Sequence, residues 1–455
     1  MTPEPLLEVK GLEIGFVTEG SHGRAVDGVS FSVEPSETLA VVGESGSGKT
    51  VTALSVLRLI PSPPGKIFAG SILFRDRGTV SDLLMLDDRV MQAVRGSRIS
   101  MIFQEPMTSL NPVYTCGSQV AEVLRLHRGM GKTEAREKVT DLFREVMLPR
   151  PEEMFRAYPH QLSGGQKQRV MIAMAIACDP ALLIADEPTT ALDVTVQQTI
   201  LRLLKKLQRS RGMSILFITH DLGLVAGFAD RLVVMRKGRI EEEGRVEEVF
   251  RNPRHPYTQG LLACRPPMDT RLKRLPTVDS YLAGGQAAPP EVITTDERKA
   301  HHHRLYAGEP VLRVEGLSKS FGAFTALDNA SLDVYPGETL GIVGESGSGK
   351  TTLARVVLEL IPPTAGRILY RDTDITRITP AAMKKLRKEL QIIFQDPYSS
   401  LNPRLTAGAA ITEPMRVHRL HGSEQARRDR AAELLEKVGM KAEHALGAVP
   451  CSGMA

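Results

Sequence analysis

The fold of this chain is decided by the stretch LAVVGESGSGKTVTALSVLRL, residues 39–59. Its four apolar residues at 39–42 predict a buried strand, and residues 51–59 have the pattern of a helix. Between them, residues 43–50 fit the spacing G-x-x-x-x-G-K-[ST] of a phosphate-binding loop. Because a strand before and a helix after are the context that such a loop requires, the stretch predicts a P-loop nucleotide-binding fold.

The chemistry of a phosphate explains the residue types in this loop. Glycines allow successive backbone N–H groups to point inward, and the start of the following helix adds partial positive charge. Lys49 can neutralise the β- and γ-phosphate oxygens, and Thr50 offers a hydroxyl to Mg²⁺. The alternative is a glycine-rich turn that binds nothing. The predicted ATP contacts of this loop are Gly43, Ser45, Gly46, Gly48, Lys49 and Thr50.

The loop occurs twice, because the nine letters VGESGSGKT stand at 42–50 and again at 343–351. MIFQEPMTSLNP at 101–112 likewise corresponds to IIFQDPYSSLNP at 392–403. Two copies of one unit are therefore predicted, a complete one over 1–265 and a partial one over 310–455. In the second copy, provided that it folds, the predicted nucleotide contacts are Gly344, Gly347, Gly349, Lys350, Thr351 and Gln395.

The segment between the two copies, 266–309, is predicted to be a linker. It is rich in Pro, Gly and Ala (YLAGGQAAPP), then polar (TTDERKAHHH), and shows no helical or strand period. The triple histidine at 301–303 could bind a metal, but no second ligand cluster is near it. A solvated linker is therefore the favoured interpretation.

Composition and charge exclude several classes of protein. The chain has 455 residues, 42% hydrophobic and 24% charged, which is typical of a globular protein with two or three domains rather than a fibre or a disordered chain. Its longest apolar run, 170–178, has half the length of a membrane-spanning helix, and the N-terminal residues do not have the pattern of a signal peptide. A cytoplasmic protein is therefore expected unless a partner recruits it to a membrane. The net charge of +5 forms no basic block and does not indicate nucleic-acid binding. The four scattered cysteines are expected to be reduced thiols rather than metal ligands.

Acidic residues follow a second apolar run, ALLIA at 181–185. Short apolar runs alternate with helical patterns in this unit, which predicts an α/β fold with a parallel sheet, and ligands bind at the carboxyl ends of such strands. Asp186 there suits Mg²⁺, and Glu187 suits the activation of water. An acidic pair is often only a turn or a helix cap, but the upstream P-loop favours the functional interpretation. His220, which ends the run FITH, is predicted to contact the γ-phosphate or the attacking water.

The segment QLSGGQKQR, 161–169, places a serine and two glycines at the start of a predicted helix, which is another anion-accepting helix N-terminus. LSGGQ is the signature of the ATP-binding domains of ABC transporters. The P-loop, Gln104, LSGGQ, ADE, TALD and His220 follow one another in that family's order, so residues 6–265 resemble the family over nearly their whole length. The resemblance implies a RecA-like P-loop NTPase fold with a helical signature subdomain, and ATP hydrolysis with Mg²⁺.

The resemblance also implies a site shared between two copies. Ser163, Gly164, Gly165 and Gln166 would cover the γ-phosphate of ATP that an opposing P-loop holds. Asp193 in TALD would lie across the dimer seam.

Further roles are implied for single residues. Gln104 would contact Mg²⁺ and report to a membrane partner. Phe16 and Phe321 resemble the aromatic residues that stack on adenine, although either ring could be part of a hydrophobic core. The implied catalytic residues are Glu187, His220 and Gln104, and the implied Mg²⁺ ligands are Thr50, Gln104, Asp186 and Thr351.

NPRHPYTQGLLACRP, 252–266, resembles the extension that follows the ATPase domain in peptide, dipeptide and nickel importers. Two ATPase units on one chain further resemble the fused ATPases of that branch, glutathione importers among them. This implies two membrane permease subunits, an extracellular solute-binding protein, an ATPase dimer, and a peripheral place at the cytoplasmic face of the inner membrane. Some relatives carry an iron–sulfur cluster on clustered cysteines, and no such cluster is implied here.

The second unit departs from the family's pattern. The chain ends at Ala455, where its own signature should begin, and the last residues VPCSGMA contain no LSGGQ. The region after Val311 is therefore expected to be marginally stable. Neither P-loop would have a complete site within one chain, so hydrolysis is expected to need two chains or a separate ATPase. The alternatives are a soluble ABC protein acting on ribosomes or DNA, a remnant that only binds ATP, and a frameshifted gene.

Overall fold

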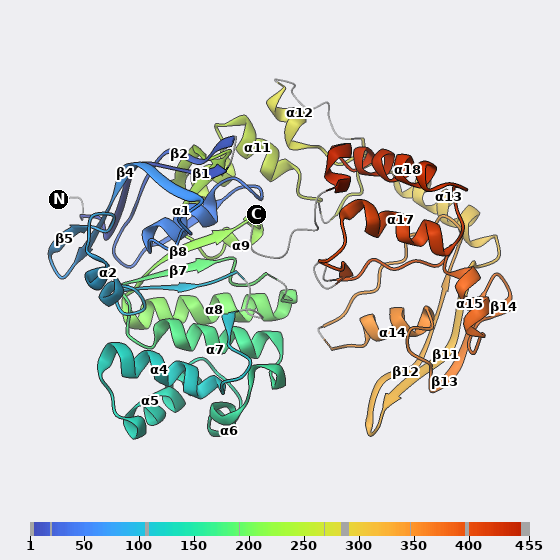
Figure 1. Cartoon of the computed structure of the whole chain (residues 1–455), viewed down its shortest axis with the longest axis horizontal. Coiled ribbons are helices and arrows are strands. Elements are labelled where there is room, and N and C mark those ends of the chain that lie inside the picture. Colours follow the sequence, from blue (N-terminus) through green and yellow to red (C-terminus); the bar gives the residue numbers. More distant parts are fainter. Residues whose placement is uncertain are drawn as a thin grey trace. The chain divides into compact units, whose positions relative to one another are not determined.

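The computed structural model describes residues 4–18, 21–104, 109–190, 192–267, 269–283, 291–345, 347–395 and 400–446. The chain divides into two compact units, Met1–Thr295 and Asp296–Ala455, each with hydrophobic clusters of its own (Figure 1). The segment VPCSGMA, 449–455, which contains no LSGGQ, lies outside the described residues. No helix of the described part of the chain combines the length and the apolar character needed to cross a membrane.

The first unit is built around a six-stranded sheet with the strand order β10-β9-β3-β8-β7-β6. The strands from β9 to β6 run parallel, and β10 pairs antiparallel with β9 at one edge. Every residue of β3, β7 and β8 is buried, which confirms the predicted parallel sheet of an α/β fold. The bounds are β3 Thr38–Val42, β6 Ile99–Ile102, β7 Leu182–Asp186, β8 Ser214–Thr219, β9 Arg231–Arg236 and β10 Arg239–Arg245.

A second, antiparallel sheet with the order β2-β1-β4-β5 belongs to the same unit. Leu7 and Val9 of β1 lie in one buried cluster with Leu39 and Val41 of β3 and with Val56 of α1. The alternating pattern of β1 buries one of its faces in this cluster. The sequence pattern predicted only the parallel sheet, and the antiparallel sheet is an addition to it. The bounds are β1 Leu7–Thr18, β2 Ser21–Val33, β4 Gly65–Asp76, β5 Thr79–Asp82 and α1 Lys49–Val56.

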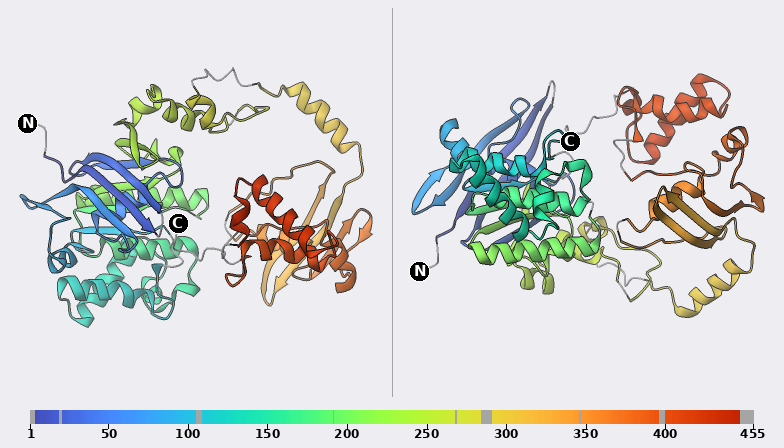
Figure 2. Two further views of the ribbon diagram at one scale, coloured as in Figure 1. Left: turned by 45° about the horizontal axis from the view of Figure 1, so that its top comes forward. Right: turned by 90° about the horizontal axis from the view of Figure 1, so that it is seen from below.

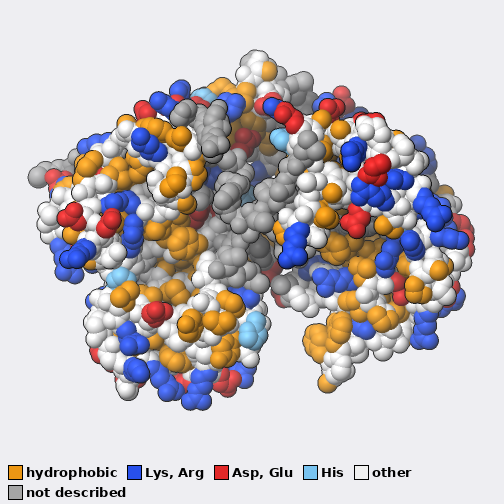
Figure 3. All heavy atoms as spheres, in the orientation of Figure 1, with side chains coloured by type: hydrophobic (Ala, Val, Ile, Leu, Met, Phe, Trp, Pro, Cys, Tyr) orange, Lys and Arg blue, Asp and Glu red, His pale blue; other side chains and the backbone are white. Residues whose placement is uncertain are grey.

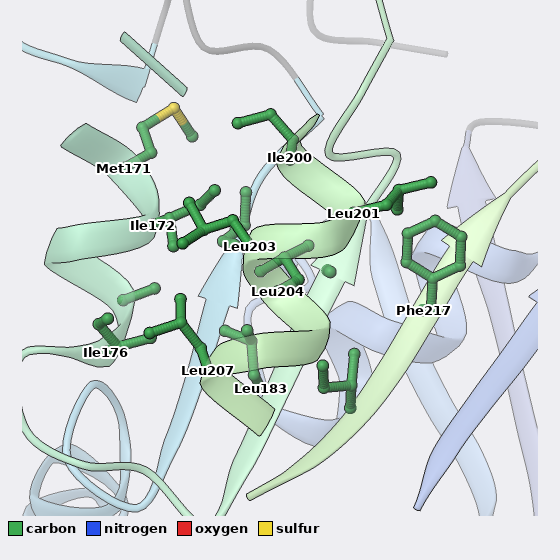
Figure 4. Close-up of a cluster of buried hydrophobic side chains, with 14 of the residues drawn as sticks. Met171, Ile172, Ile176, Leu183, Ile200, Leu201, Leu203, Leu204, Leu207 and Phe217 are labelled. Atoms are coloured by element: carbon green, nitrogen blue, oxygen red, sulfur yellow. The ribbon is translucent and has the colours of Figure 1, made fainter. Parts of the chain in front are cut away.

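Helices α7 and α8 cover the other face of the six-stranded sheet. Ile172 of α7 lies beside Leu203 of α8, and Ile176 lies beside Leu207, with Leu183 of β7 close by (Figure 4). All of these side chains are buried, so truncating one of them to alanine is expected to cost about 2–5 kcal/mol of stability. The bounds are α7 Gly164–Ile176 and α8 Val194–Arg211.

A group of helices, α4 to α6, packs against α7 and forms the helical subdomain that the resemblance implied. It lies on the side of the unit away from the antiparallel sheet (Figure 1 and Figure 2). The bounds are α4 Cys116–Arg128, α5 Lys132–Glu145 and α6 Pro151–Arg156. Further helices among the described residues of the unit are α2 Asp88–Val94, η1 Pro159–Gln161, α9 Leu222–Val225, α10 Val246–Arg251, α11 Pro256–Ala263 and α12 Val278–Leu282.

The segment 266–309, whose sequence shows no helical or strand period, is not irregular throughout. Besides α12 it contains α13, Thr295–Tyr306. The first turn of α13 carries Asp296 and Glu297 and its last turn carries His303 and Arg304, which complement the helix dipole. No residue of α13 is buried, so the triple histidine is on a solvated helix. Within the described ranges, no group of three or more His, Cys, Asp or Glu side chains could hold a metal ion.

The second unit repeats the antiparallel sheet of the first, with the order β12-β11-β13-β14. The register is the same: Leu312 pairs with Val334 as Leu7 pairs with Val33. Lys and Arg side chains are interspersed with Asp and Glu over the visible face of each unit (Figure 3). The bounds are β11 Leu312–Phe321, β12 Phe324–Val334, β13 Ala365–Tyr370, β14 Thr373–Asp374, α14 Lys350–Val357, α15 Pro380–Leu386, α17 Ala407–Val417, α18 Glu424–Lys437 and η2 Ala442–Leu446.

The counterpart of β3 in the second unit does not form a strand. Residues 339–345 have no regular structure, although TLGIV at 339–343 differs little from TLAVV of β3. β3 is paired with β8 on one side and β9 on the other, whereas the described part of the second unit contains no parallel strand. Val343 is consequently 92% exposed, while Val42 of β3 is fully buried.

Candidate active site

The phosphate loop follows β3 and leads into α1, which begins at Lys49 and ends at Val56 rather than spanning the predicted 51–59. Two glycines of the phosphate loop are required because a side chain in their place would collide with neighbouring backbone atoms. A Cβ atom at Gly43 would lie 2.1 Å from the carbonyl oxygen of Met235, and one at Gly48 would lie 2.5 Å from that of Ala25. Both glycines also have positive φ angles, 154° and 98°. The local sequence therefore folds as the motif predicted.

Lys49 is buried over this loop. Its Nζ atom donates to the carbonyl oxygens of Gly43 and Glu44, each at 2.8 Å, and lies 3.4 Å from Oγ of Ser47. Burial lowers the pKa of Lys49, while the nearby carboxylates of Glu187 and Asp186 raise it. The ammonium group is thus held at the loop by carbonyl oxygens, which phosphate oxygens can replace.

Thr50 and Asp186 meet at the carboxyl end of β7. The hydroxyl of Thr50 donates to Oδ1 of Asp186 at 3.2 Å. Asp186 is almost fully buried, and this burial raises its pKa to about 6. A hydroxyl and a buried carboxylate are oxygen donors of the kind that Mg²⁺ prefers, so the residues present fit the cation.

The carboxylate of Glu187 is held by three side chains. Its Oε1 atom lies 2.9 Å from Nδ1 of His220, and its Oε2 atom accepts from Nε2 of Gln104 at 3.0 Å and from Oγ1 of Thr190 at 2.9 Å. Burial raises the pKa of Glu187, but the hydrogen bonds from His220 and Thr190 outweigh this and leave the pKa below its ordinary value. The structure therefore brings together Glu187, His220 and Gln104 as predicted. Thr190 was not predicted.

A cavity of about 510 Å³ lies between the phosphate loop and these side chains. The P-loop contributes one wall, and the residues that hold Glu187 contribute another. Leu261 on α11 also lines the cavity, which the sequence analysis did not foresee. The lining residues are Gly43, Glu44, Ser45, Gln104, Glu187, Thr190, His220, Leu222 and Leu261.

A family model described as "ABC transporter" matches residues 26–190 and, a second time, residues 327–450. The chain belongs to the ABC transporter family. A second model, described as "Oligopeptide/dipeptide transporter, C-terminal region", matches residues 242–289 of this ABC chain. The two matches confirm the resemblance that LSGGQ and NPRHPYTQGLLACRP indicated.

Curated relatives extend over almost the whole ABC chain. The glutathione import ATP-binding protein GsiA of Salmonella typhimurium is 46% identical over 453 residues, which cover 97% of this chain and 72% of the relative. GsiA of Pectobacterium atrosepticum is 45% identical, with 98% and 73% covered. GsiA of Escherichia coli K12 is 44% identical, with 97% and 72% covered.

The chain is also similar to solved structures of single ATP-binding cassettes. A post-hydrolysis dimer of the cassette MJ0796 with ADP and Pi is 28% identical, with a TM-score of 0.47, 53% of this chain covered and 98% of that chain. The protein cbiO1 of Clostridium perfringens, part of the transporter complex cbiONQ, is 26% identical, with a TM-score of 0.47 and coverages of 55% and 92%.

The ABC signature lies at the start of α7 and is not part of the cavity lining. The N–H of Gln166 donates to Oγ of Ser163 at 3.3 Å, and the N–H of Ser163 donates to Oε1 of Gln166 at 2.9 Å, which is a capping box. Asp193 caps α8 by accepting the N–H of Val196 at 2.9 Å. The described residues that line the cavity do not include Ser163, Gly164, Gly165, Gln166 or Asp193.

Phe16 is not among the described residues that line this cavity, and Phe321 belongs to the second unit. Phe16 lies on β1, opposite Gly65 of β4, and Phe321 ends β11 with Nζ of Lys319 at 5.0 Å from the centre of its ring. Both remain predictions as adenine contacts.

The second P-loop repeats the lysine arrangement of the first. Nζ of Lys350 donates to the carbonyl oxygens of Gly344 and Glu345 at 2.7 and 2.6 Å. Thr351 lies in the first turn of α14, and Gln395 is exposed. Gly347 and Gly349 have the positive φ angles of their counterparts. The site roles of Gly344, Gly347, Gly349, Lys350, Thr351 and Gln395 remain predictions.

Proposed function

We propose that this chain is the ATP-binding and ATP-hydrolysing subunit of an ABC importer for peptides or related small solutes. The observation that carries the proposal is the position of Glu187. Its carboxylate is held by His220, Gln104 and Thr190 in the cavity that the phosphate loop lines. A fixed carboxylate that faces a phosphate loop is suited to activate water for attack on a γ-phosphate.

Each residue of the site has a separate task in hydrolysis. The N–H groups of the loop and the start of α1 bind the β- and γ-phosphates. Lys49 exchanges its carbonyl acceptors for phosphate oxygens and neutralises their charge. Because the pKa of Glu187 is lowered, the carboxylate is ionised at neutral pH and can accept a proton from water. His220 keeps that carboxylate oriented.

Thr50 and Asp186, with Gln104 as a further ligand, would hold Mg²⁺ in this site. The ion would neutralise negative charge on the phosphates during transfer. Thr50 and Asp186 already lie within hydrogen-bond distance of each other, so their oxygens can meet at one cation. Thr351 would be the corresponding ligand in the second unit.

The complete catalytic site forms between two ATPase units. Ser163, Gly164, Gly165 and Gln166 would cover the γ-phosphate on an opposing P-loop, and Asp193 would lie at the seam. Their place outside the cavity of their own unit supports this proposal, because a signature that served its own P-loop would line that cavity. The opposing unit belongs to a second copy of this chain or to another ATPase. ATP must bind the closed pair more tightly than the open units to drive closure.

The partners follow from the importer architecture. We propose two membrane permease subunits, which receive the movement through the region after Gln104, and an extracellular solute-binding protein. The chain would act at the cytoplasmic face of the inner membrane as a peripheral subunit. The match of residues 242–289 to an oligopeptide and dipeptide transporter region, and the relatives named for glutathione import, support a peptide-like solute.

The proposed domain boundaries are 1–265 for the complete ATPase unit, 266–309 for the linker and 310–455 for the second unit. In this arrangement Phe16 and Phe321 would stack on the adenine of the nucleotide bound to their own unit. The second unit would bind ATP through Lys350.

Co-purification tests the proposed function. The tagged full chain is captured from detergent-solubilised membranes, and the captured material is assayed for ATP hydrolysis. Integral membrane proteins together with hydrolysis are expected. Capture of ribosomes instead would favour a soluble ABC factor, and ATP binding without partners or hydrolysis would favour a non-catalytic remnant.

A further inference from the structure

The motif NPRHPYTQGLLACRP has a physical role that its resemblance did not explain, because it forms α11 beside the phosphate loop. Tyr257, in the first turn of α11, is 0% exposed. Its phenolic oxygen accepts the backbone N–H of Glu44 at 3.1 Å. One helical turn further on, Leu261 lines the ATP cavity. The extension therefore contacts the site at two positions of one helix.

The neighbouring motif residues fix α11 on the edge of the six-stranded sheet. Glu242 of β10 accepts the backbone N–H groups of Arg254 and His255 at 2.9 and 3.0 Å. Nδ1 of His255 then accepts the N–H of Tyr257 at 3.2 Å and caps the helix. Because these contacts hold the helix start to β10, the direction of the Tyr257 side chain is set by the sheet.

The ring of Tyr257 is also held from the side of β9. The guanidinium of Arg236, the last residue of β9, lies 5.3 Å from the centre of the ring. The turn after β9 contacts the same loop, since the N–H of Gly238 donates to the carbonyl oxygen of Ser47 at 3.0 Å. The phosphate loop is thus supported near its start by Tyr257 and further along by Gly238.

The amide of Glu44 is the part of the loop that this support fixes. It follows Gly43, whose φ angle of 154° few other residues adopt. The second P-loop is an internal comparison: its Glu345 stands in the same place, and within the described ranges its amide has no hydrogen-bond partner. The same nine letters therefore occur with and without a tyrosine.

We propose that Tyr257 is a positioning residue for ATP binding, which holds the first turn of the phosphate loop in its phosphate-binding shape by accepting the N–H of Glu44. The peptide-importer extension is then a structural part of the ATP site and not an appendage to it. The inference rests on the proposed function, since it requires that the first P-loop binds ATP.

The variant Tyr257→Phe tests this, because it removes one oxygen atom and keeps the buried ring. It is made in a full chain that also carries Lys350→Ala, which removes the lysine of the second P-loop. The measured ATP binding then reports on the first P-loop. The dissociation constant for ATP is expected to rise about 3- to 10-fold, as for a lost buried hydrogen bond, while one ATP still binds per chain. The matched control is Tyr281→Phe on α12, which lies next to Gly260 of α11.

Two readouts separate positioning from a general loss of stability. Amide hydrogen exchange over 42–50 is expected to accelerate in Tyr257→Phe, while exchange over 343–351, measured in the chain without Lys350→Ala, stays unchanged. In ATPase assays KM is expected to rise at constant kcat. A fall in bound ATP per chain or in kcat, with the dissociation constant and KM unchanged, would overturn the proposal, as would unchanged exchange over 42–50.

A measurement on the unaltered sequence keeps the proposal testable even where the variant folds poorly. ATP is expected to slow amide exchange in α11 more than AMP does, because only ATP fills the phosphate loop that Tyr257 contacts. Equal protection by both nucleotides would overturn the proposal. If the parent chain with Lys350→Ala does not bind ATP, the proposed function fails together with the inference, whereas ATP binding unaffected by Tyr257→Phe overturns the inference alone.

Discussion

The hydroxyl of Thr190 donates to Oε2 of Glu187 at 2.9 Å, on the same oxygen that accepts the side-chain amide of Gln104. With His220 on the other oxygen, the carboxylate is fixed at both ends. Thr190 comes three residues after Glu187, in the turn that follows β7, and its N–H donates to the carbonyl oxygen of Glu187. This turn brings the hydroxyl of Thr190 to the Glu187 carboxylate.

Thr190→Val is expected to lower kcat about tenfold and leave KM for ATP nearly unchanged, because it removes a support of the carboxylate without touching the phosphate loop. Steady-state ATPase kinetics measure this. Thr199→Val, on α8 with its hydroxyl bonded to the carbonyl oxygen of Thr195, is the matched control. Equal kcat values in the two variants would show that Glu187 does not depend on Thr190.

Glu187→Gln is expected to reduce hydrolysis by at least about 100-fold, since an amide cannot accept the proton of the attacking water. ATP should still bind, and the paired ATPase units should remain closed. Light scattering after gel filtration in ATP should show a dimer, which Glu122→Gln on α4 does not accumulate. Undiminished turnover in Glu187→Gln would remove Glu187 from its proposed role.

Lys49→Ala and Lys350→Ala should differ in their effects. Lys49 belongs to the phosphate loop beside the cavity that Glu187 and His220 line. The loss of Lys49 is therefore expected to lower the rate of hydrolysis roughly 100-fold or more. The loss of Lys350 should reduce turnover much less. Phosphate release assays on both variants decide this. Equal losses would mean that both P-loops take part in the rate-limiting reaction.

The stability of the protein without Mg²⁺ is expected to depend on pH through Asp186. Its pKa is raised to about 6 from an ordinary 3.8, so the folded protein holds this proton more tightly than the unfolded chain does. The resulting stability is present below about pH 4 and is lost as the pH rises through about 6, a change of about 3 kcal/mol.

Asp186→Asn should therefore raise the free energy of unfolding at pH 8 by that amount and change it little at pH 4. Urea unfolding in EDTA at both pH values measures this, with the exposed Asp141→Asn as a control. A stabilisation that is the same at pH 4 and pH 8 would contradict the assignment to the proton on Asp186.

The second unit is expected to be digested at least about ten times faster than the first. Its apolar residues Val343 and Ile393 are 92% and 98% exposed, and its buried cluster is small. Limited trypsin proteolysis followed by mass spectrometry should leave a fragment close to Met1–Thr295. Survival of both halves for the same time would show that the second unit is as stable as the first.

The parts of the fold that the sequence predicted are local. The strand before Gly43, the helix after it and the carboxylate pair at the end of β7 each follow from a short run of letters. The antiparallel sheet was missed because the alternation in β1 is interrupted by irregular register. α13 was missed because a polar helix without an apolar face has no period to detect.

The residues of the site that were missed depend on contacts across the chain. Tyr257 and Glu44 are 213 residues apart, and no spacing rule connects them. Leu261 cannot be told from a core leucine in the sequence, and only the position of α11 brings it to the cavity. A motif predicts the groups that react, whereas the groups that hold them in place depend on tertiary contacts.

The two P-loops show how little a motif fixes by itself. VGESGSGKT follows a strand enclosed on both sides in one unit and an unpaired, exposed segment in the other. Counting such motifs along a genome therefore says little about the fold around each copy, and the enclosure of the strand upstream has to be established for every copy separately.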